Sequence, residues 1–293
     1  MDIRLLSLPG TPQARAAHAL LDRARRADGI APFSEQFVLG LDDPRLGHRH
    51  AVATQDGEVV GLLALGEEGE LVVDPAHRRR GVATRLIDAL PPAPLWAHGD
   101  LEGARGLAEA RDMRATRRLQ VLGIEGEALE RAAQAPKIPE GYALSDLEDL
   151  SARWGRDRVL ERWLRANNEA FDWHPEQGGW DWERLERAME VSWFDPRGVV
   201  FLTHGEELAG FHWTKWHGGE EALGEVYVVG LAAGYRGRHL GDPLLRAGLF
   251  RLAQRGARRV ILYVESDNRA ALKVYHRWGF EVVEEHVVYT QGS

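Results

Sequence analysis

Cysteine is absent from the sequence, and this absence excludes disulfides, thiolate metal sites and a covalent acyl-cysteine intermediate. A long apolar run is also missing: the start, MDIRLLSLPG, has no cationic segment before a hydrophobic stretch, and nothing approaches a membrane span. Basic residues are not in excess, because the formal net charge is −8. This balance argues against nucleic acid and leaves room for a cationic substrate. We therefore expect a cytoplasmic protein with no membrane or nucleic-acid partner.

Several motifs of common enzyme classes are missing as well. The sequence has no GxGxxG, no GxxxxGK[ST] and no GxSxG, so it carries neither nucleotide fingerprint nor the nucleophile elbow of a serine hydrolase. Twelve histidines invite a metal hypothesis. His174, His204, His212 and His217 form no HExxH or similar pair, so no metal site is predicted.

What the sequence does contain is a pattern that occurs twice. Residues 262–280 read LYVESDNRAALKVYHRWGF, and residues 95–113 read LWAHGDLEGARGLAEARDM without a gap against them. In this alignment Leu95 falls under Leu262, and Ala108 falls under Tyr275. A repeat of about 160 residues is too long for a solenoid and fits two copies of one domain. We expect one copy to be catalytic and the other to have a supporting, structural role.

The segment GEALERAAQAPKIPEGYAL separates the two copies, with two prolines and a glycine between patterned stretches. It places the boundary near residues 135 to 140, with domains 1–137 and 138–293. Each domain begins with antiparallel hairpins, such as residues 51–66 around Asp56-Gly57, and continues with alternating strands and helices. This order predicts an α/β fold with a sheet of mixed direction.

Each copy also has a basic turn between a buried strand and an amphipathic helix. The turns read VDPAHRRRGVATRL (73–86) and LAAGYRGRHLGDPLL (231–245). Backbone N–H groups and the dipole at such a helix start favour negative charge, and the arginines add to it. The arrangement suits a pyrophosphate. The alternative is an ordinary helix start with surface arginines.

These residues resemble the acetyl-CoA pyrophosphate signature of the GNAT N-acetyltransferases, through Arg78-x-x-Gly81-x-Ala83. The second copy departs from the signature, because His239 stands where it has glycine. His239 must either adopt a permissive backbone conformation or displace the turn. The resemblance implies two tandem GNAT-like domains, each a mixed, mostly antiparallel sheet flanked by helices. Acetyl-CoA would lie where the fourth and fifth strands splay apart.

A more specific resemblance, to the mycothiol synthase family of tandem GNAT enzymes, covers nearly the whole chain. It is carried by FSEQ (33–36), WHPEQGGW (173–180), GFHWTKW (210–216), GEVYVVGL (224–231) and the 262–280 segment. The resemblance implies acetylation of the cysteinyl amine of Cys-GlcN-Ins by acetyl-CoA. The residues expected to bind acetyl-CoA are Leu71, Val72, Val73, Arg79, Arg80, Gly81, Val82, Ala83, Thr84, Val229, Gly230, Leu231, Arg236, Gly237, Arg238, His239, Leu240, Gly241, Asp242, Asn268, Arg269, Ala270, Ala271, Leu272 and Lys273.

Acetyl transfer to an amine requires a base, because amines are mostly protonated at neutral pH. Glu225 begins the strand EVYVVGL, and even spacing places it on the same face as Val229. Free N–H groups at 229–231 would hold the thioester oxygen. Taken alone, Glu225 would be read as a solvated strand-end carboxylate; the resemblance favours the catalytic role.

Tyr275 is the expected proton donor to the departing CoA thiolate. Its alternative is packing on the apolar face of the helix. Ala108 removes any such acid from the first copy, which is therefore expected to be non-catalytic.

The resemblance also assigns acceptor contacts to Glu35, Glu176, Lys215 and Tyr263, beside Glu225. Carboxylates suit a substrate with an amine and many hydroxyls, and a lysine donates to sugar or inositol oxygens. Glu35 is equally compatible with an ordinary surface glutamate after Pro32. Two other functions stay open: a tandem acetyltransferase for another amine, such as an aminoglycoside or a protein N-terminus, and a non-catalytic acetyl-CoA-binding protein. An internal duplication makes a monomer sufficient.

Overall fold

The computed structural model describes residues 1–172, 177–220 and 222–292, and these form two compact units. Unit 1 comprises Met1–Gln120, Glu265–Asp267 and Glu284–Ser293, and unit 2 comprises Val121–Val264 and Asn268–Val283. The predicted domains, 1–137 and 138–293, follow the sequence repeat, and that division stays a prediction. The compact units differ from it because a strand packs with the sheet to which it is hydrogen-bonded, wherever it lies in the sequence.

Unit 1 is built on a sheet with the strand order β1-β2-β3-β4-β5-β12-β6. Its strands are β1 (Asp2–Leu6), β2 (Arg49–Gln55), β3 (Glu58–Leu65), β4 (Gly69–Val73), β5 (Leu95–Ala97), the first part of β6 (Met113–Glu125) and most of β12 (Glu281–Gln291). The pairs β1–β2, β2–β3, β3–β4 and β5–β12 are antiparallel, and the pair β4–β5 is parallel. The last strand of the chain thus completes the sheet of the first unit.

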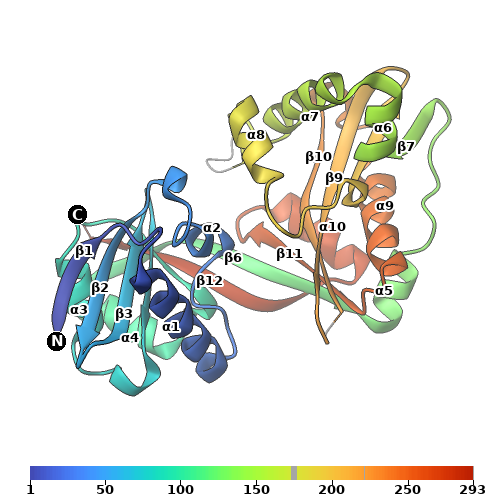
Figure 1. Ribbon diagram of the computed structural model, residues 1–293. Coiled ribbons are helices and arrows are strands. Elements are labelled where there is room, and N and C mark those ends of the chain that lie inside the picture. The colour runs from blue at the N-terminus through green and yellow to red at the C-terminus, as the bar shows by residue number, and fades with distance from the viewer. Residues whose placement is uncertain (173–176, 221, 293) are drawn as a thin grey trace. The chain divides into compact units, whose positions relative to one another are not determined.

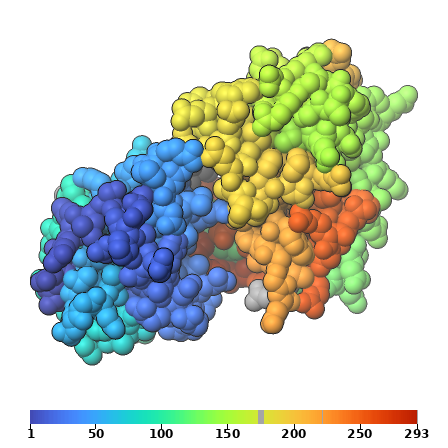
Figure 2. All heavy atoms as spheres, in the orientation of Figure 1, coloured from blue at the N-terminus to red at the C-terminus, as the bar shows by residue number. Residues whose placement is uncertain are grey.

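The helices of unit 1 are α1 (Pro12–Asp28), α2 (Glu35–Leu39), α3 (Val82–Asp88) and α4 (Glu102–Ala110). Pro12 at the first position and the left-handed Gly29 beyond the last one delimit α1, as expected for proline and glycine at helix ends. In Figure 1, α1 crosses the sheet of unit 1, and its atoms (dark blue) form the surface over that sheet in Figure 2.

Unit 2 has the strand order β6-β11-β10-β9-β8-β7. Besides the end of β6, its strands are β7 (Tyr142–Asp146), β8 (Val199–His204), β9 (Glu207–Gly218), β10 (Leu223–Leu231) and β11 (Arg259–Glu265). Strands β7 to β10 are antiparallel, and β10 pairs with β11 in parallel. Both units therefore have the predicted mixed, mostly antiparallel sheet flanked by helices.

The helices of unit 2 cover both faces of its sheet. They are α5 (Gly126–Ala132), α6 (Leu147–Trp154), α7 (Arg156–Ala170), α8 (Trp182–Ala188), α9 (Gly241–Gln254) and α10 (Arg269–Trp278). One core cluster contains Trp163 of α7 with Phe201 and Trp213, and another contains Leu249 of α9 with Val226. Because both faces are covered, Val199–Thr203 of β8 are all buried, rather than alternately buried and exposed.

No helix among the described residues is long and apolar enough to cross a membrane.

Candidate active site

The β9–β10 hairpin of unit 2 brings two predicted site residues together. Glu225 on β10 lies directly opposite Lys215 on β9, so both side chains are on the same face of the sheet. The two residues are only 5% and 8% exposed. Burying a charged side chain costs free energy unless it has a partner of opposite charge or hydrogen bonds. Glu225 is therefore not the solvated strand-end carboxylate that the sequence alone would suggest.

A β-bulge at Tyr227 corrects one expectation about this strand. Val226 is opposite Thr214 and Val228 is opposite Trp213, so Tyr227 is an extra residue in β10. An extra residue reverses the alternation of faces. The expected placement of Glu225 and Val229 on one face is therefore wrong: Val229 is opposite His212, on the other face. Even spacing predicts faces only in a regular strand.

Strands β10 and β11 splay apart beyond this bulge. Their parallel ladder runs from Leu223 to Val226 of β10 and is not continued to Leu231. Toward β9, the Ala232 N–H donates to Ala209 O at 3.0 Å. Successive N–H groups of a strand point to alternate sides, so this bond fixes which N–H groups of β10 face β9. The N–H groups of Val229 and Leu231 then point toward the open side. The splay thus leaves two backbone donors, on the same strand as Glu225, that are suited to a ligand oxygen.

His217 is a site residue that sequence reasoning missed. Its Nε2 lies 2.7 Å from Oε2 of Glu225, and its side chain is 32% exposed. It connects a buried carboxylate to the surface, as a proton path requires. The even spacing of Lys215 and His217 on β9 was the available signal. Metal-ligand spacing does not reveal it, because the partner of His217 is a carboxylate on the neighbouring strand.

Lys215 lies against two aromatic rings that the sequence did not connect with it. Its Nζ is 4.6 Å from the ring centroid of Trp193 and 5.6 Å from that of Tyr227. Such cation–π contacts stabilise a desolvated ammonium. They fix the lysine head beside these two rings.

Tyr275 lies on α10 and packs in the core cluster that also includes Val226 and Val229. Its ring is edge-on to Phe280, with 5.8 Å between centroids. Burial raises the pKa of the Tyr275 phenol to about 12, so the hydroxyl keeps its proton at neutral pH. Tyr275 thus packs in the core with its hydroxyl protonated, and its role as proton donor to CoA stays a prediction.

The basic turns of the two units share one backbone conformation, although their glycines differ in position. In unit 1, Arg79 and Gly81 have φ of 61° and 76°, and in unit 2 Gly237 and His239 have φ of 74° and 58°. Each turn therefore has two residues in the left-handed conformation, of which one is a glycine and the other carries a side chain. Of the two alternatives for His239, the structure shows the permissive conformation.

The first arginine of each turn binds protein groups. The Arg236 guanidinium donates to Glu169 O at the end of α7, and Glu169 Oε2 accepts the Ala233 N–H at 2.9 Å. In unit 1, both terminal nitrogens of Arg78 donate to Asp28 at the end of α1, at 2.7 and 2.6 Å. Arg238 differs from Arg236, because its guanidinium lies 5.1 Å from the Tyr235 ring centroid on the exposed turn. Arg236 thus anchors the turn to α7, whereas Arg238 lies against the Tyr235 ring.

Two other predicted acetyl-CoA residues have structural partners. Asn268 caps α10 by accepting the Ala271 N–H at 3.1 Å. Asp242 pairs with Arg277 at 2.7 Å, which joins the first turn of α9 to α10. The remaining residues of these segments, 269–273 in unit 2 and 82–84 in unit 1, form the first turns of α10 and α3. The two helix starts are where the sequence placed them.

The predicted acceptor residues are only partly placed. Tyr263 on β11 is 47% exposed, and Glu35 begins α2 in unit 1. Glu176 lies outside the described residues. No group of three or more His, Asp or Glu in the described part of the chain could hold a metal ion.

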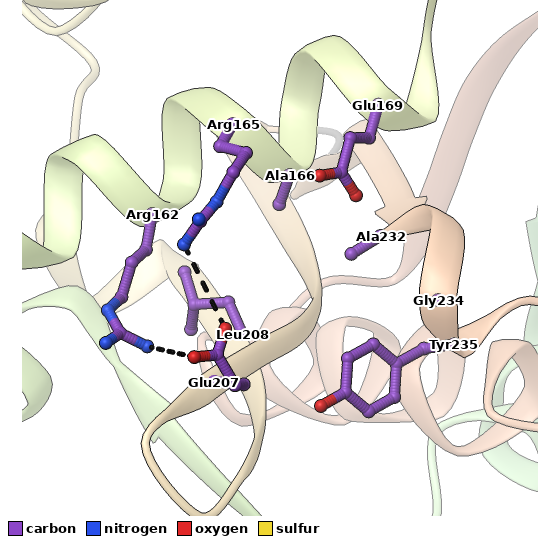
Figure 3. A pocket seen from close by; sticks show the side chains of 9 residues that line it. All are labelled: Arg162, Arg165, Ala166, Glu169, Glu207, Leu208, Ala232, Gly234 and Tyr235. Carbon is purple, nitrogen blue, oxygen red and sulfur yellow. Dashed lines mark ion pairs between the residues drawn. The ribbon is translucent and has the colours of Figure 1, made fainter.

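A cavity of about 180 Å³ lies beside the anchored turn (Figure 3). Its lining includes Glu169, Tyr235 and Arg162, and Glu207 forms ion pairs across it with Arg162 at 3.3 Å and Arg165 at 3.9 Å. Of the predicted catalytic and acceptor residues that the structure describes, none lines it. This cavity is therefore not the reaction site.

Comparison with known proteins agrees with this geometry. Residues 161–280 match the "Acetyltransferase (GNAT) family" and residues 47–119 match the "Acetyltransferase (GNAT) domain". A mycothiol acetyltransferase of Corynebacterium aurimucosum is 51% identical, covering 96% of this chain and 95% of that protein. That of Corynebacterium efficiens is 52% identical, covering 93% and 91%.

Solved structures support the fold. A tandem GNAT protein from the clavulanic acid biosynthesis pathway has a TM-score of 0.70 at 18% identity, over 100% of this chain and 99% of that one. A GCN5-related N-acetyltransferase from Sphaerobacter thermophilus has a TM-score of 0.66 at 20% identity, over 98% and 94%. With two GNAT units in tandem and relatives matched over nearly its full length, this chain belongs to the mycothiol acetyltransferase family, whose co-substrate is acetyl-CoA.

Proposed function

We propose that unit 2 transfers the acetyl group of acetyl-CoA to the cysteinyl amine of Cys-GlcN-Ins, which yields mycothiol. The observation that carries this proposal is the buried Glu225, paired across the hairpin with Lys215, bonded to His217 and adjacent to the splay. The names of the relatives supply the acceptor, and the residues supply the chemistry.

In this proposal Glu225 accepts a proton from the acceptor ammonium and, as the new C–N bond forms, from the attacking amine. His217 carries protons from Glu225 toward solvent. The N–H groups of Val229 and Leu231 stabilise the negative charge that develops on the thioester oxygen. When the C–S bond breaks, Tyr275 donates its proton to the CoA sulfur. The phenol suits this step because its raised pKa keeps the proton available.

Acceptor recognition is assigned to Glu35, Glu176, Lys215 and Tyr263. Lys215 is held by Trp193 and Tyr227, so its ammonium donates to sugar or inositol oxygens from a fixed position. Arg238, with the backbone of the 236–242 turn, would hold the CoA pyrophosphate. We further propose that the chain acts as a monomer, because one chain supplies both units. We also propose that it acts in the cytoplasm.

Unit 1 is proposed to bind acetyl-CoA without turnover. Its turn has the same pair of left-handed residues, and β4 leaves its parallel partner β5 after Glu70, as β10 leaves β11. Ala108, buried on α4, stands at the position of Tyr275 and has no proton to donate.

The test is a direct assay of the chain with acetyl-CoA and Cys-GlcN-Ins, following free CoA and the mass of the acetylated product. GlcN-Ins without its cysteine is the matched control and should release no CoA above background. An aminoglycoside and a peptide with a free N-terminus test the alternative acceptors. If the enzyme acetylated either of these compounds but not Cys-GlcN-Ins, the proposed acceptor would be wrong.

A further inference from the structure

Unit 1 contains a buried carboxylate that none of the roles above uses. Glu70 on β4 is 1% exposed, and both of its oxygens have partners. Oε2 accepts the backbone N–H of Ser34 at 2.7 Å, and Oε1 lies 3.0 Å from Nε2 of His98, at ion-pair distance. A carboxylate this deep in a protein is retained only with such partners. Glu70 is therefore part of an organised polar network.

His286 of β12 extends this network. Its Nδ1 accepts the Gly99 N–H at 3.2 Å and lies 3.1 Å from Nδ1 of His98. Burial, followed by the nearby His98, lowers the pKa of His286 to about 3, so His286 is neutral and its Nδ1 is an acceptor. His98 Nδ1 is then the donor to His286, and His98 Nε2 faces Oε1 of Glu70.

The network holds the segment FSEQ. Ser34 is the N-cap residue of α2, and its side chain makes no capping hydrogen bond. Glu70 instead accepts a hydrogen bond from the backbone N–H of Ser34. Phe33 and Phe37 on either side are 4% and 7% exposed, and Phe37 stacks on His48 with 4.5 Å between centroids. The segment is thus fixed by two buried rings and one carboxylate, and Glu35 is the residue that follows the held amide.

We infer that Glu70, supported by His98 and His286, is a positioning residue for acceptor binding, acting by orienting Glu35 at the start of α2. This inference rests on the proposed function, because that proposal assigns Glu35 to the acceptor. The hydrogen bond involves a charged acceptor, so its loss should matter more than that of a neutral one. A site residue displaced by about 1 Å loses much of its contribution.

The test is Glu70→Gln, which keeps the size of the side chain and removes its charge. We expect the KM for Cys-GlcN-Ins to rise about 10-fold, the usual scale for a charge-assisted hydrogen bond. The kcat and the KM for acetyl-CoA should be unchanged. Glu35→Gln should raise the same KM, and adding Glu70→Gln to it should cause no further rise, because Glu70 acts through Glu35.

Asp74→Asn is the matched control. Asp74 is also a buried carboxylate of unit 1, bonded to a backbone N–H (Ala76, 2.9 Å) and to a cation (Arg23, 2.7 Å), but it does not contact FSEQ. Both substitutions should lower the melting temperature, and only Glu70→Gln should change the acceptor KM. Equal KM effects in the two variants, or additive effects of Glu35→Gln and Glu70→Gln, would show a merely structural role.

Amide hydrogen exchange of residues 33–40 separates failure of this inference from failure of the proposed function. Glu70→Gln and, as a second variant, His98→Gln should accelerate exchange there, whichever acceptor the enzyme uses. Unchanged exchange overturns the network. Faster exchange with an unchanged acceptor KM, in an enzyme that acetylates Cys-GlcN-Ins, overturns the role in binding. A wild-type enzyme inactive on Cys-GlcN-Ins refutes the proposed function and, with it, the acceptor role of Glu70.

Discussion

The two units have the same hairpin after their first strands, but it is longer in unit 2. Strands β3 and β4 have 8 and 5 residues, whereas β9 and β10 have 12 and 9. The two hairpins correspond at the end away from the turn, where Gly61 pairs with Val73 in unit 1 and Gly210 pairs with Leu231 in unit 2. The extra length therefore lies at the turn, where unit 2 carries Lys215 and Glu225.

Unit 1 has its turn at the corresponding place, between Leu65 and Gly69, with Glu67 exposed there. A carboxylate in an exposed turn is solvated and lacks the neighbours that Glu225 has. The comparison shows that the proposed chemistry depends on a short extension of one hairpin. The shared frame of sheet, turn and helix start is the part suited to acetyl-CoA.

The helices after β5 and β11 agree equally well in position. The gapless alignment predicted from the sequence places Glu102 under Arg269, and these are the first residues of α4 and α10. Ala108 and Tyr275 therefore occupy matching sites on matching helices. The difference between them is a single side chain, which a substitution can test.

The largest expected effect is that of Glu225→Gln, with Glu67→Gln as its counterpart in unit 1. Loss of a general base should lower kcat by roughly 10²-fold or more. Glu67→Gln should leave kcat unchanged, because the residue is exposed in a turn. Steady-state CoA release checks both, with circular dichroism to confirm folding. A Glu225→Gln enzyme with near-normal turnover would remove the base from the proposal.

Tyr275→Phe should lower kcat by roughly 10²-fold at pH 7, the lower end of the range for loss of a general acid. Because the phenol pKa is about 12, wild-type kcat should show no loss from Tyr275 deprotonation until the pH approaches that value. The deficit of the variant should shrink at alkaline pH, where the CoA thiolate leaves without a proton.

Tyr289→Phe in unit 1 is the control for Tyr275→Phe. Burial and the hydrogen bond to Asp100 raise the pKa of Tyr289 to about 12 as well, so the two phenols are alike in protonation. Only the unit 2 change should alter kcat. A Tyr275→Phe deficit of equal size at every pH would indicate packing instead of proton donation.

The corresponding turn residues Arg238 and Arg80 should behave differently. Arg238→Ala removes a charge proposed to face the pyrophosphate and should raise the KM for acetyl-CoA about 10-fold. Arg80→Ala should leave kcat unchanged at saturating acetyl-CoA and reduce the thermal stabilisation of unit 1 by CoA, because a ligand stabilises the state that binds it. If Arg80→Ala abolished turnover, the active site would lie in unit 1.

The smallest effect is expected from exchanging the left-handed residues. A left-handed conformation costs a non-glycine residue roughly 1 kcal/mol, so His239→Gly and Arg79→Gly should each stabilise their turn by up to that amount. Denaturant unfolding with each variant measures this. Only His239→Gly should also change the KM for acetyl-CoA, by a few-fold at most. A loss of stability in either variant would show that the side chain makes contacts worth more than the strain.

Much of the fold was predictable because its signals are local. The turn at Asp56-Gly57 and the start of α9 are set by neighbouring residues, and the amphipathic helix predicted after the second basic turn is α9 (Gly241–Gln254). The family was predictable for another reason: segments such as FSEQ and LYVESDN are specific as strings of residues, independent of where they lie in space.

The candidate site was predictable as a set of residues, and its geometry was not. Nothing near Tyr227 marks the bulge that places Glu225 and Val229 on opposite faces, because a bulge appears only when β10 is paired with β9. The bond from His217 to Glu225 depends on the same pairing. The anchoring of Arg236 depends on where α7 ends in space.

The sequence by itself determined the duplication, the two turns, the helix starts and the family. Tertiary structure alone decided that β12 completes the sheet of unit 1, and that His286 thereby reaches His98 and Glu70 beside Ser34. The physical reason is that hydrogen bonds between strands and contacts between buried side chains join residues far apart in sequence. Their pairing follows from how the whole chain packs, which no local pattern records.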